Sequence, residues 1–411
     1  MKNKVIGISK NITQSFREFI HSNQFSGILL IFSAVISLVF SNSILGHKYV
    51  EFWHIDVGIS FGNLSFNKPI EFWINEICMS FFFLLVGLEI KRELFIGELN
   101  SVSKAALPIA AAIGGMLVPA FLYSLINIDK PTIGGWAIPT ATDIAFALGI
   151  LALLGSRVPM AIKVFLTALA VVDDLGAVLI IAVFYTKEIL IEYLVYSAIV
   201  FVLLIVFNLT KVKRNTPFLI LGVLLWYCFY KTGIHPTLSG VIVAFCIPML
   251  KGISASPLKR LENILHTPVT FLIMPLFALA NCAMELSSNS NFSLFDHLEL
   301  GIFLGLMIGK PLGIFVVSFL ATKFKLATLP QEVNWKHMFG VSILGGIGFT
   351  MSIFICNLSF TNLEYINHGK LSIFISSAVA AILGLLFLYF STFKTTEITQ
   401  NTEEITPNID Q

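Results

Sequence analysis

Apolar runs of about twenty residues recur from residue 27 to residue 392, separated by short polar connections. An α-helix rises 1.5 Å per residue, so about 20 apolar residues cross the roughly 30 Å hydrocarbon core of a bilayer. The pattern therefore predicts an all-α polytopic membrane protein with twelve transmembrane helices. The predicted spans are residues 26–45, 70–90, 105–127, 132–155, 162–186, 190–209, 217–230, 235–250, 268–285, 300–321, 337–358 and 370–392.

Lysine and arginine residues alternate between the two sides of these spans. Of the 26, 19 fall in one set of connections and 6 in the opposite set, while Lys310 lies within the tenth span. Because cytoplasmic loops carry the excess of positive charge, this split predicts a multi-pass protein of the bacterial inner membrane with both termini in the cytoplasm. The segment before the first span shows no signal-peptide cleavage pattern, so we expect that span to be retained.

Two segments depart from the helical pattern. Residues 55–66 are rich in strand-forming residues around a Gly-Asn pair, which predicts a small extracytoplasmic β-hairpin. The polar residues after position 392 have no apolar period, so they are predicted to be disordered. The expected organisation is a cytoplasmic N-terminal segment (1–25), a single membrane domain (26–392) and a disordered cytoplasmic tail (393–411).

Composition supports the membrane assignment. Of the 411 residues, 56% are hydrophobic and 12% are charged, about half the charged fraction of a typical soluble protein. The net charge of +2 is too small to indicate a nucleic-acid partner. The five cysteines lie in apolar runs without metal-type spacing, so we expect them to be core residues, and we expect no cofactor.

Two adjacent aspartates interrupt the otherwise apolar fifth span. Asp173 lies nine residues after Val164, about 13–14 Å along a helix and so near the middle of the bilayer. An aspartate there costs roughly 2.5–3.5 kcal/mol on insertion scales, and neighbouring carboxylates resist ionising together. Either polar neighbours satisfy Asp173 and Asp174 structurally, or the pair is a site. We favour a site that holds protons or a hard cation such as Na⁺.

The fourth span contains a proline, Pro139, followed by Thr140, Thr142 and Asp143. Proline removes a backbone donor and clashes with the preceding turn. Freed backbone groups at this depth are tolerated only inside protein or beside a cavity. A simple kinked helix is the alternative, but Asp143 favours an interrupted helix. The eleventh span has a matching glycine-rich defect at residues 345–348.

The two defects occupy corresponding positions. Spans three to five and spans ten to twelve run in opposite orientations, and each set has an interrupted middle helix. This predicts an inverted-topology repeat in which two discontinuous helices, 132–155 and 337–358, cross near the bilayer midplane and form the substrate site. The buried Lys310 needs partners. We expect it to offset the helix ends at the breaks, to pair with Asp173 or Asp174, or to do both.

Several of these stretches together closely resemble one known family. The chain resembles the NhaA-type sodium/proton antiporters over about residues 10–392, which is nearly its whole length. The inverted repeat is itself a feature of that family, so it is not independent support. The stretches that carry the resemblance are 83–93 (FLLVGLEIKRE), 141–149 (ATDIAFALG), 170–176 (AVVDDLG), 308–314 (IGKPLGI) and 346–352 (GIGFTMS).

The resemblance implies roles for residues at matching positions. It implies that Asp173, Asp174 and Thr142 bind the ion, with Asp173 and Asp174 as the carboxylate ligands of the metal ion. It implies that Lys310 and Asp143 serve charge compensation and proton coupling. The positions tied to the pH response of the family are Glu89, Arg92, Glu262, His266 and His235.

Taken singly, each of these surface groups is better explained as an ordinary solvated charge. This chain also departs from the familiar pattern at two positions. Asn263 stands where a second histidine is familiar, and Glu76 stands where an aspartate is familiar. These departures affect the expected pH set-point rather than the ion site.

The sequence therefore predicts an antiporter that exchanges cytoplasmic Na⁺, and Li⁺, for external H⁺ by alternating access. The resemblance implies electrogenic exchange, activation at neutral to alkaline pH, and a homodimer formed through the hairpin at 55–66. A sodium-coupled symporter of an organic anion is the alternative, although it would need a roomy anion pocket with basic or hydroxyl donors, and Lys310 is the only basic residue at the midplane. An intramembrane aspartyl protease is disfavoured. The two catalytic aspartates of such an enzyme lie on separate helices that face each other, whereas Asp173 and Asp174 are adjacent on one helix.

Overall fold

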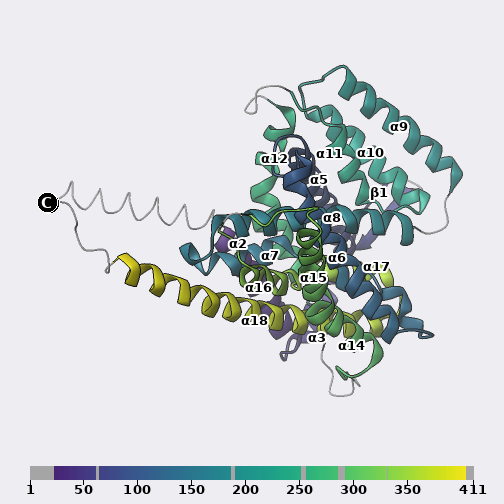
Figure 1. Ribbon diagram of the computed structural model, residues 1–411. Helices are drawn as coiled ribbons and strands as arrows, with labels where there is room; N and C mark the ends of the chain where they lie inside the picture. The colour runs from purple at the N-terminus through teal and green to yellow at the C-terminus, as the bar shows by residue number, and fades with distance from the viewer. Residues whose placement is uncertain are drawn as a thin grey trace, which may run out of the picture.

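The computed structural model describes residues 23–61, 64–186, 190–250, 256–285, 292–330 and 332–403. Its α-helices are α2 (Asn23–Ser41), α3 (Gly46–Trp53), α4 (Ile70–Trp73), α5 (Met79–Phe95), α6 (Val102–Ile126), α7 (Ile144–Ala152), α8 (Met160–Phe184), α9 (Ile191–Leu209), α10 (Thr216–Thr232), α11 (Leu238–Cys246), α12 (Pro257–Pro268), α13 (Met274–Asn281), α14 (His297–Leu304), α15 (Lys310–Lys323), α16 (Trp335–Gly345), α17 (Phe349–Ser359) and α18 (Leu363–Glu403). Buried apolar side chains from α2 to α18 form one continuous core. α9 and α10 lie at one edge of the bundle, and α18 projects from the other (Figure 1).

The helices confirm a multi-pass membrane protein. Among the described residues, seven stretches are long and apolar enough to cross a bilayer, and the number becomes ten if each of three bent helix pairs is one span. α10 and α11, in the seventh and eighth predicted spans, have only 17 and 9 residues. The count of twelve spans therefore stays a prediction.

Two of the bent pairs coincide with the predicted breaks. The segment 131–140 meets α7 at 44°, and α16 meets α17 at 42°. Residues 141–143 are extended rather than helical, so the fourth span is interrupted and not merely kinked. Its first half differs from the expected α-helix, because it consists of the 3₁₀ turns η2 (Pro131–Gly135) and η3 (Ile138–Thr140). Glycines and a proline in so short a stretch favour these tighter turns.

Close helix packing brings α15 against α6. A Cβ atom at Gly114 would lie 2.2 Å from the Gly313 carbonyl oxygen, and one at Gly313 would lie 2.1 Å from the Gly114 oxygen. Only glycine permits this approach. Small residues at such crossings are typical of membrane bundles, where packing replaces the hydrophobic effect as the driving force. The contact places Lys310, the first residue of α15, inside the bundle.

Two antiparallel strands lie where the hairpin was predicted. β1 (Asp56–Phe61) pairs with β2 (Leu64–Pro69), with Asp56 opposite Pro69. The predicted turn at 62–63 lies outside the described residues. The sheet is anchored to the membrane helices, because the Trp73 indole nitrogen donates to the Val57 carbonyl at 2.8 Å.

The last helix extends past the predicted end of the membrane domain. α18 continues as a helix to Glu403, beyond the expected start of disorder at residue 393. A helix that is already formed adds residues without a new nucleation step, so a polar continuation is feasible. Residues 404–411 and most of the N-terminal segment, residues 1–22, lie outside the described part.

Candidate ion-binding site

The two aspartates occupy the middle of α8, with 13 helical residues before Asp173 and 10 after Asp174. Both are buried, at 1% and 2% exposure. The helix breaks contact Asp173 through Thr142, whose hydroxyl lies 2.6 Å from Asp173 Oδ2 and 3.0 Å from the Gly345 carbonyl oxygen. The structure therefore brings the predicted carboxylates together with both breaks.

Asp143 joins the two broken helices. Its backbone N–H donates to the Ile347 carbonyl at 2.7 Å. One carboxylate oxygen accepts from the Phe146 N–H at the start of α7 (2.9 Å). The other accepts from the N–H (3.1 Å) and the hydroxyl of Thr350 at the start of α17. A single carboxylate thus caps the positive N-terminal ends of two half-helices, where a negative charge is most favourable.

Lys310 does both of the things expected of it. Its Nζ lies 2.8 Å from Asp173 Oδ2 and donates to the Thr140 carbonyl at 2.6 Å. Thr140 ends η3, so the ammonium also lies at the negative C-terminal end of a half-helix. All three groups are buried, which strengthens each of these interactions relative to water.

Asp173 and Asp174 consequently have different surroundings. One oxygen of Asp173, Oδ2, contacts both the Lys310 ammonium and the Thr142 hydroxyl. Asp174 forms no ion pair within the described part of the chain, and its buried Oδ1 accepts no hydrogen bond there. No cluster of three or more His, Cys, Asp or Glu side chains suited to a metal ion occurs among the described residues. A cation at this pair would therefore draw further ligands from hydroxyl and backbone oxygens, which suit Na⁺.

A π-helical turn precedes the lysine. η7 (Gly305–Gly309) inserts an extra residue into the helix that leads from α14 to α15. Such bulges occur often at functional sites, because they rotate the following side chains. No prediction from the sequence included this turn. The sequence does contain a local indication of irregular helix, because glycines and Pro311 surround Lys310. The spacing of apolar residues, however, does not reveal a single inserted residue.

Four of the five expected pH-response residues lie together. Glu89, Arg92, Glu262 and His266 line a cavity of about 410 Å³, which we name the Glu262 cavity. Glu262 Oε1 accepts from Arg92 at 3.1 Å and from Lys259 at 2.9 Å.

The Glu262 cavity extends toward the ion site. Asn263, the position of the missing histidine, lines it, and so does Val171 of α8. Val171 precedes Asp174 by three residues and so shares its helix face.

His235 is the exception. Its Nε2 lies 3.7 Å from Glu76 Oε1, near the start of α5. Glu76 and Glu89 are 13 residues apart on one helical stretch, or about 20 Å. The structure therefore separates His235 from the other four and places it beside Glu76, the second position at which the chain departs from the familiar pattern.

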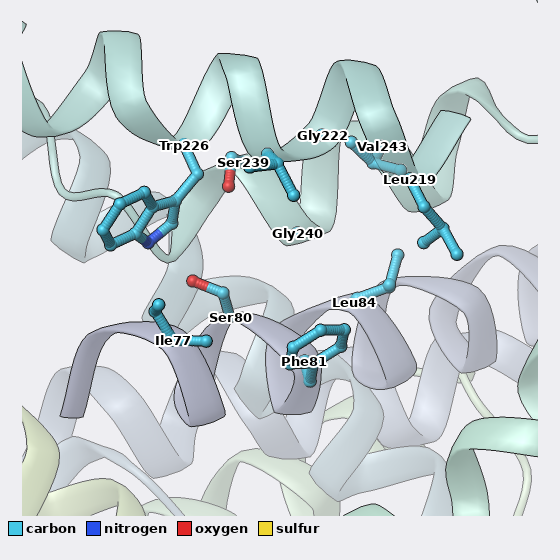
Figure 2. Close-up of a pocket in the computed structure, with 11 residues that line it drawn as sticks. Ile77, Ser80, Phe81, Leu84, Leu219, Gly222, Trp226, Ser239, Gly240 and Val243 are labelled. Atoms are coloured by element: carbon cyan, nitrogen blue, oxygen red, sulfur yellow. The ribbon is translucent and has the colours of Figure 1, made fainter. Parts of the chain in front are cut away.

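A hollow of about 170 Å³ lies between α5, α10 and α11. Figure 2 shows apolar side chains on each wall, with Phe81 and Leu84 facing Leu219 and Val243. No residue that lines this hollow carries a carboxylate. It is unsuited to a cation, and the ion site belongs at the helix breaks.

Known proteins match the chain over nearly its full length. The family described as Na⁺/H⁺ antiporter 1 matches residues 17–388. A Na⁺/H⁺ antiporter NhaA of Flavobacterium psychrophilum is 49% identical over 380 residues, which cover 92% of this chain and 96% of the relative. The NhaA 1 antiporter of Clostridium beijerinckii is 44% identical over 401 residues, or 97% and 100% of the two chains.

A third relative, the NhaA 2 antiporter of Aliarcobacter butzleri, is 47% identical over 389 residues, covering 92% of this chain and 98% of the relative. The matched region contains both broken helices, the aspartate pair and Lys310. The geometry at the helix breaks and these similarities agree. The chain belongs to the Na⁺/H⁺ antiporter family and is a membrane transporter of Na⁺ and H⁺, not an enzyme.

Proposed function

We propose that this protein exchanges cytoplasmic Na⁺ or Li⁺ for external H⁺ by alternating access, with Asp174 as the group that binds either cargo. The observation that carries this is the contrast within the pair. Lys310 neutralises Asp173, whereas the adjacent buried carboxyl has no cationic partner among the described residues. A group with that environment is stable only when a proton or a cation occupies it.

The exchange follows from competition for the same oxygens. Na⁺ arriving through the Glu262 cavity displaces the proton of Asp174 and competes with Lys310 for Asp173. If the ammonium loses its proton when the cation binds, more than one proton is exchanged for each Na⁺. Exchange would then be electrogenic. At low pH protons occupy the site and transport stalls, so activity rises toward neutral and alkaline pH.

The orientation rests on the charge asymmetry of the connections. The Glu262 cavity lies at the end of the helices flanked by the basic connections, which supports a position on the cytoplasmic side of a bacterial inner membrane, with both termini on that side. The twelve-span inverted-repeat architecture accommodates this arrangement. The β1–β2 sheet lies at the opposite end, where it is available to a second copy of the chain in a homodimer.

The test is dissipation of a pH gradient in inverted membrane vesicles, with Na⁺, Li⁺ and K⁺ added separately between pH 6 and 9. Na⁺ and Li⁺ should collapse the gradient without any organic solute, and K⁺ should not. A gradient that responds only when an organic anion accompanies Na⁺ would favour the symporter and contradict the proposal.

A further inference from the structure

A second cavity, of about 560 Å³, lies at the end of the bundle opposite the Glu262 cavity. We name it the Glu71 cavity. Its lining includes Glu71 of α4, Lys370 of α18, and two asparagines, Asn75 and Asn357. Lys370 and Glu71 form a long ion pair at 3.7 Å. On the proposed orientation, this cavity faces the outside of the cell.

Three asparagines meet at the bottom of the Glu71 cavity. Asn281 Nδ2 donates to Asn75 Oδ1 at 2.7 Å, and Asn357 Nδ2 donates to Asn281 Oδ1 at 2.7 Å. Asn281 is only 1% exposed. The three residues come from separate elements, namely the π-helical turn η1 (Ile74–Cys78), α13 and α17. We name this group the amide clasp.

One face of α17 connects the amide clasp to the ion site. Thr350, Phe354 and Asn357 are spaced four and three residues apart and therefore share that face. Thr350 binds Asp143 at the helix break. The seven residues from Thr350 to Asn357 correspond to about 10 Å of helix. A path from the ion site to the Glu71 cavity along α17 must pass the clasp.

An aromatic layer lies on the same path. The ring of Phe354 contacts the ring of Phe83 on α5 and the imidazole of His235, each with centroids 5.4 Å apart. Phe354 and Phe83 are each 1% exposed. The route to the Glu71 cavity is therefore blocked twice, by aromatic rings and then by bonded amides. The Glu262 cavity, in contrast, reaches α8 at Val171.

We propose that the amide clasp is the outer gate of the antiporter. In this structure it holds α17 against α13 and η1 and closes the Glu71 cavity from the ion site. Opening requires α17 to move away, which breaks the Asn357–Asn281 bond. The freed Asn281 Oδ1 then faces the departing Na⁺ and replaces part of its hydration shell.

The chemistry of amides suits a gate that opens in every cycle. A hydrogen bond between amides contributes little net free energy, because water replaces the lost partner when the contact opens. The closed and open states therefore remain close enough in free energy to exchange. The inference rests on the proposed alternating-access function and adds residues that position the outer gate.

The test measures access to Met79, the first residue of α5, which is fully buried and lies between Asn75 of η1 and Phe83 of α5 along the chain. Met79→Cys is placed in full-length protein whose five native cysteines are replaced, and the protein is reconstituted in oriented vesicles. A membrane-impermeant maleimide is added from the Glu71 side. Asn357→Asp keeps the side-chain size but removes the donated hydrogen bond. We expect the labelling rate to rise about fivefold, because the loss of one net hydrogen bond raises the ratio of open to closed molecules by about that factor.

Two controls make the result specific. Asn367→Ala alters an asparagine that lines the same cavity outside the clasp, and it should leave the rate unchanged. A second reporter, Asn263→Cys in the Glu262 cavity, should not label faster from its own side in the Asn357→Asp protein. Should both reporters label faster, the substitution merely loosens packing and the gate is refuted.

Equal labelling of Met79→Cys with and without Asn357→Asp also overturns the gate. Asn357→Ala provides a second variant in case Asn357→Asp does not insert. Na⁺-dependent proton exchange of the unaltered chain is measured in the same vesicles. If that exchange is absent, the proposed function fails. If exchange is present and labelling does not change, only the clasp proposal fails.

Discussion

The charges at the helix crossing and the charges in the Glu262 cavity are organised differently. At the crossing, the Lys310 and Asp173 side chains are both 0% exposed. In the cavity, Arg92 and Lys259 keep 32% and 31% exposure although they share Glu262. Water and salt screen the second group far more than the first. On the proposed function, we infer that the crossing performs the exchange, while the cavity adjusts the local potential that an arriving cation meets.

The strongest test of this division is Asp174→Asn. The substitution keeps the size of the side chain but removes the exchangeable proton and the anionic ligand, so Na⁺/H⁺ exchange should be abolished while membrane insertion is retained. Vesicle exchange, normalised to the amount of inserted protein, measures the effect. Robust exchange by this variant would show that Asp174 is not the cargo site.

Lys310→Arg and His266→Ala compare the two regions directly. Arginine stays charged at every accessible pH, so it keeps competing with Na⁺ for Asp173, and activation should move to higher pH by more than about one unit. Loss of His266 removes the positive charge that an imidazole carries below its ordinary pKa of about 6.5. We therefore expect a shift to lower pH of less than about one unit.

The measurement for this pair is the pH profile of exchange at several Na⁺ concentrations. One result would contradict these roles: exchange by His266→Ala that no longer depends on pH, together with an unchanged midpoint in Lys310→Arg. The Glu262 cavity would then be a dedicated pH sensor.

Asp143→Asn tests the electrostatics of the crossing without removing a cargo ligand. The amide keeps one acceptor oxygen, so it can cap α7 or α17 but not both, and it loses the charge that faces both N-termini. We expect a loss of about 1–3 kcal/mol in stability. Thermal unfolding in detergent measures it, with Thr350→Val as a control that removes only the hydroxyl. A Tm equal to that of the unaltered protein would show that the N-termini do not depend on this charge.

The smallest effect is expected for the sheet, which is remote from both regions. Deleting residues 56–69 joins Ile55 to Ile70, whose backbone groups are already hydrogen-bonded at 3.1 Å. Transport per molecule should be nearly unchanged, while dimers dissociate more readily in dilution experiments. A loss of transport in well-inserted monomers would mean that the sheet contributes to the exchange itself.

Most of the candidate site could be recognised in the sequence, because its parts are exceptional in a membrane segment. Asp173, Asp174 and Lys310 stand out because charge in a bilayer is costly. The breaks near Pro139 and Gly346 stand out because proline and clustered glycines act locally on the backbone. The two-stranded sheet was also predictable from its strand-forming residues.

The sequence by itself thus determined that this is a multi-pass helical protein with an acidic pair between two broken spans. Only the tertiary structure decided which aspartate Lys310 neutralises. Adjacent helical residues point about 100° apart, and the rotation of α8 against α15 selects between them. The tertiary structure also decided that Asp143 caps both half-helices and that His235 lies apart from the Glu262 cavity. It likewise brought together three asparagines that are distant in the sequence. Each of these depends on contacts between elements far apart along the chain, which local patterns of polarity do not encode.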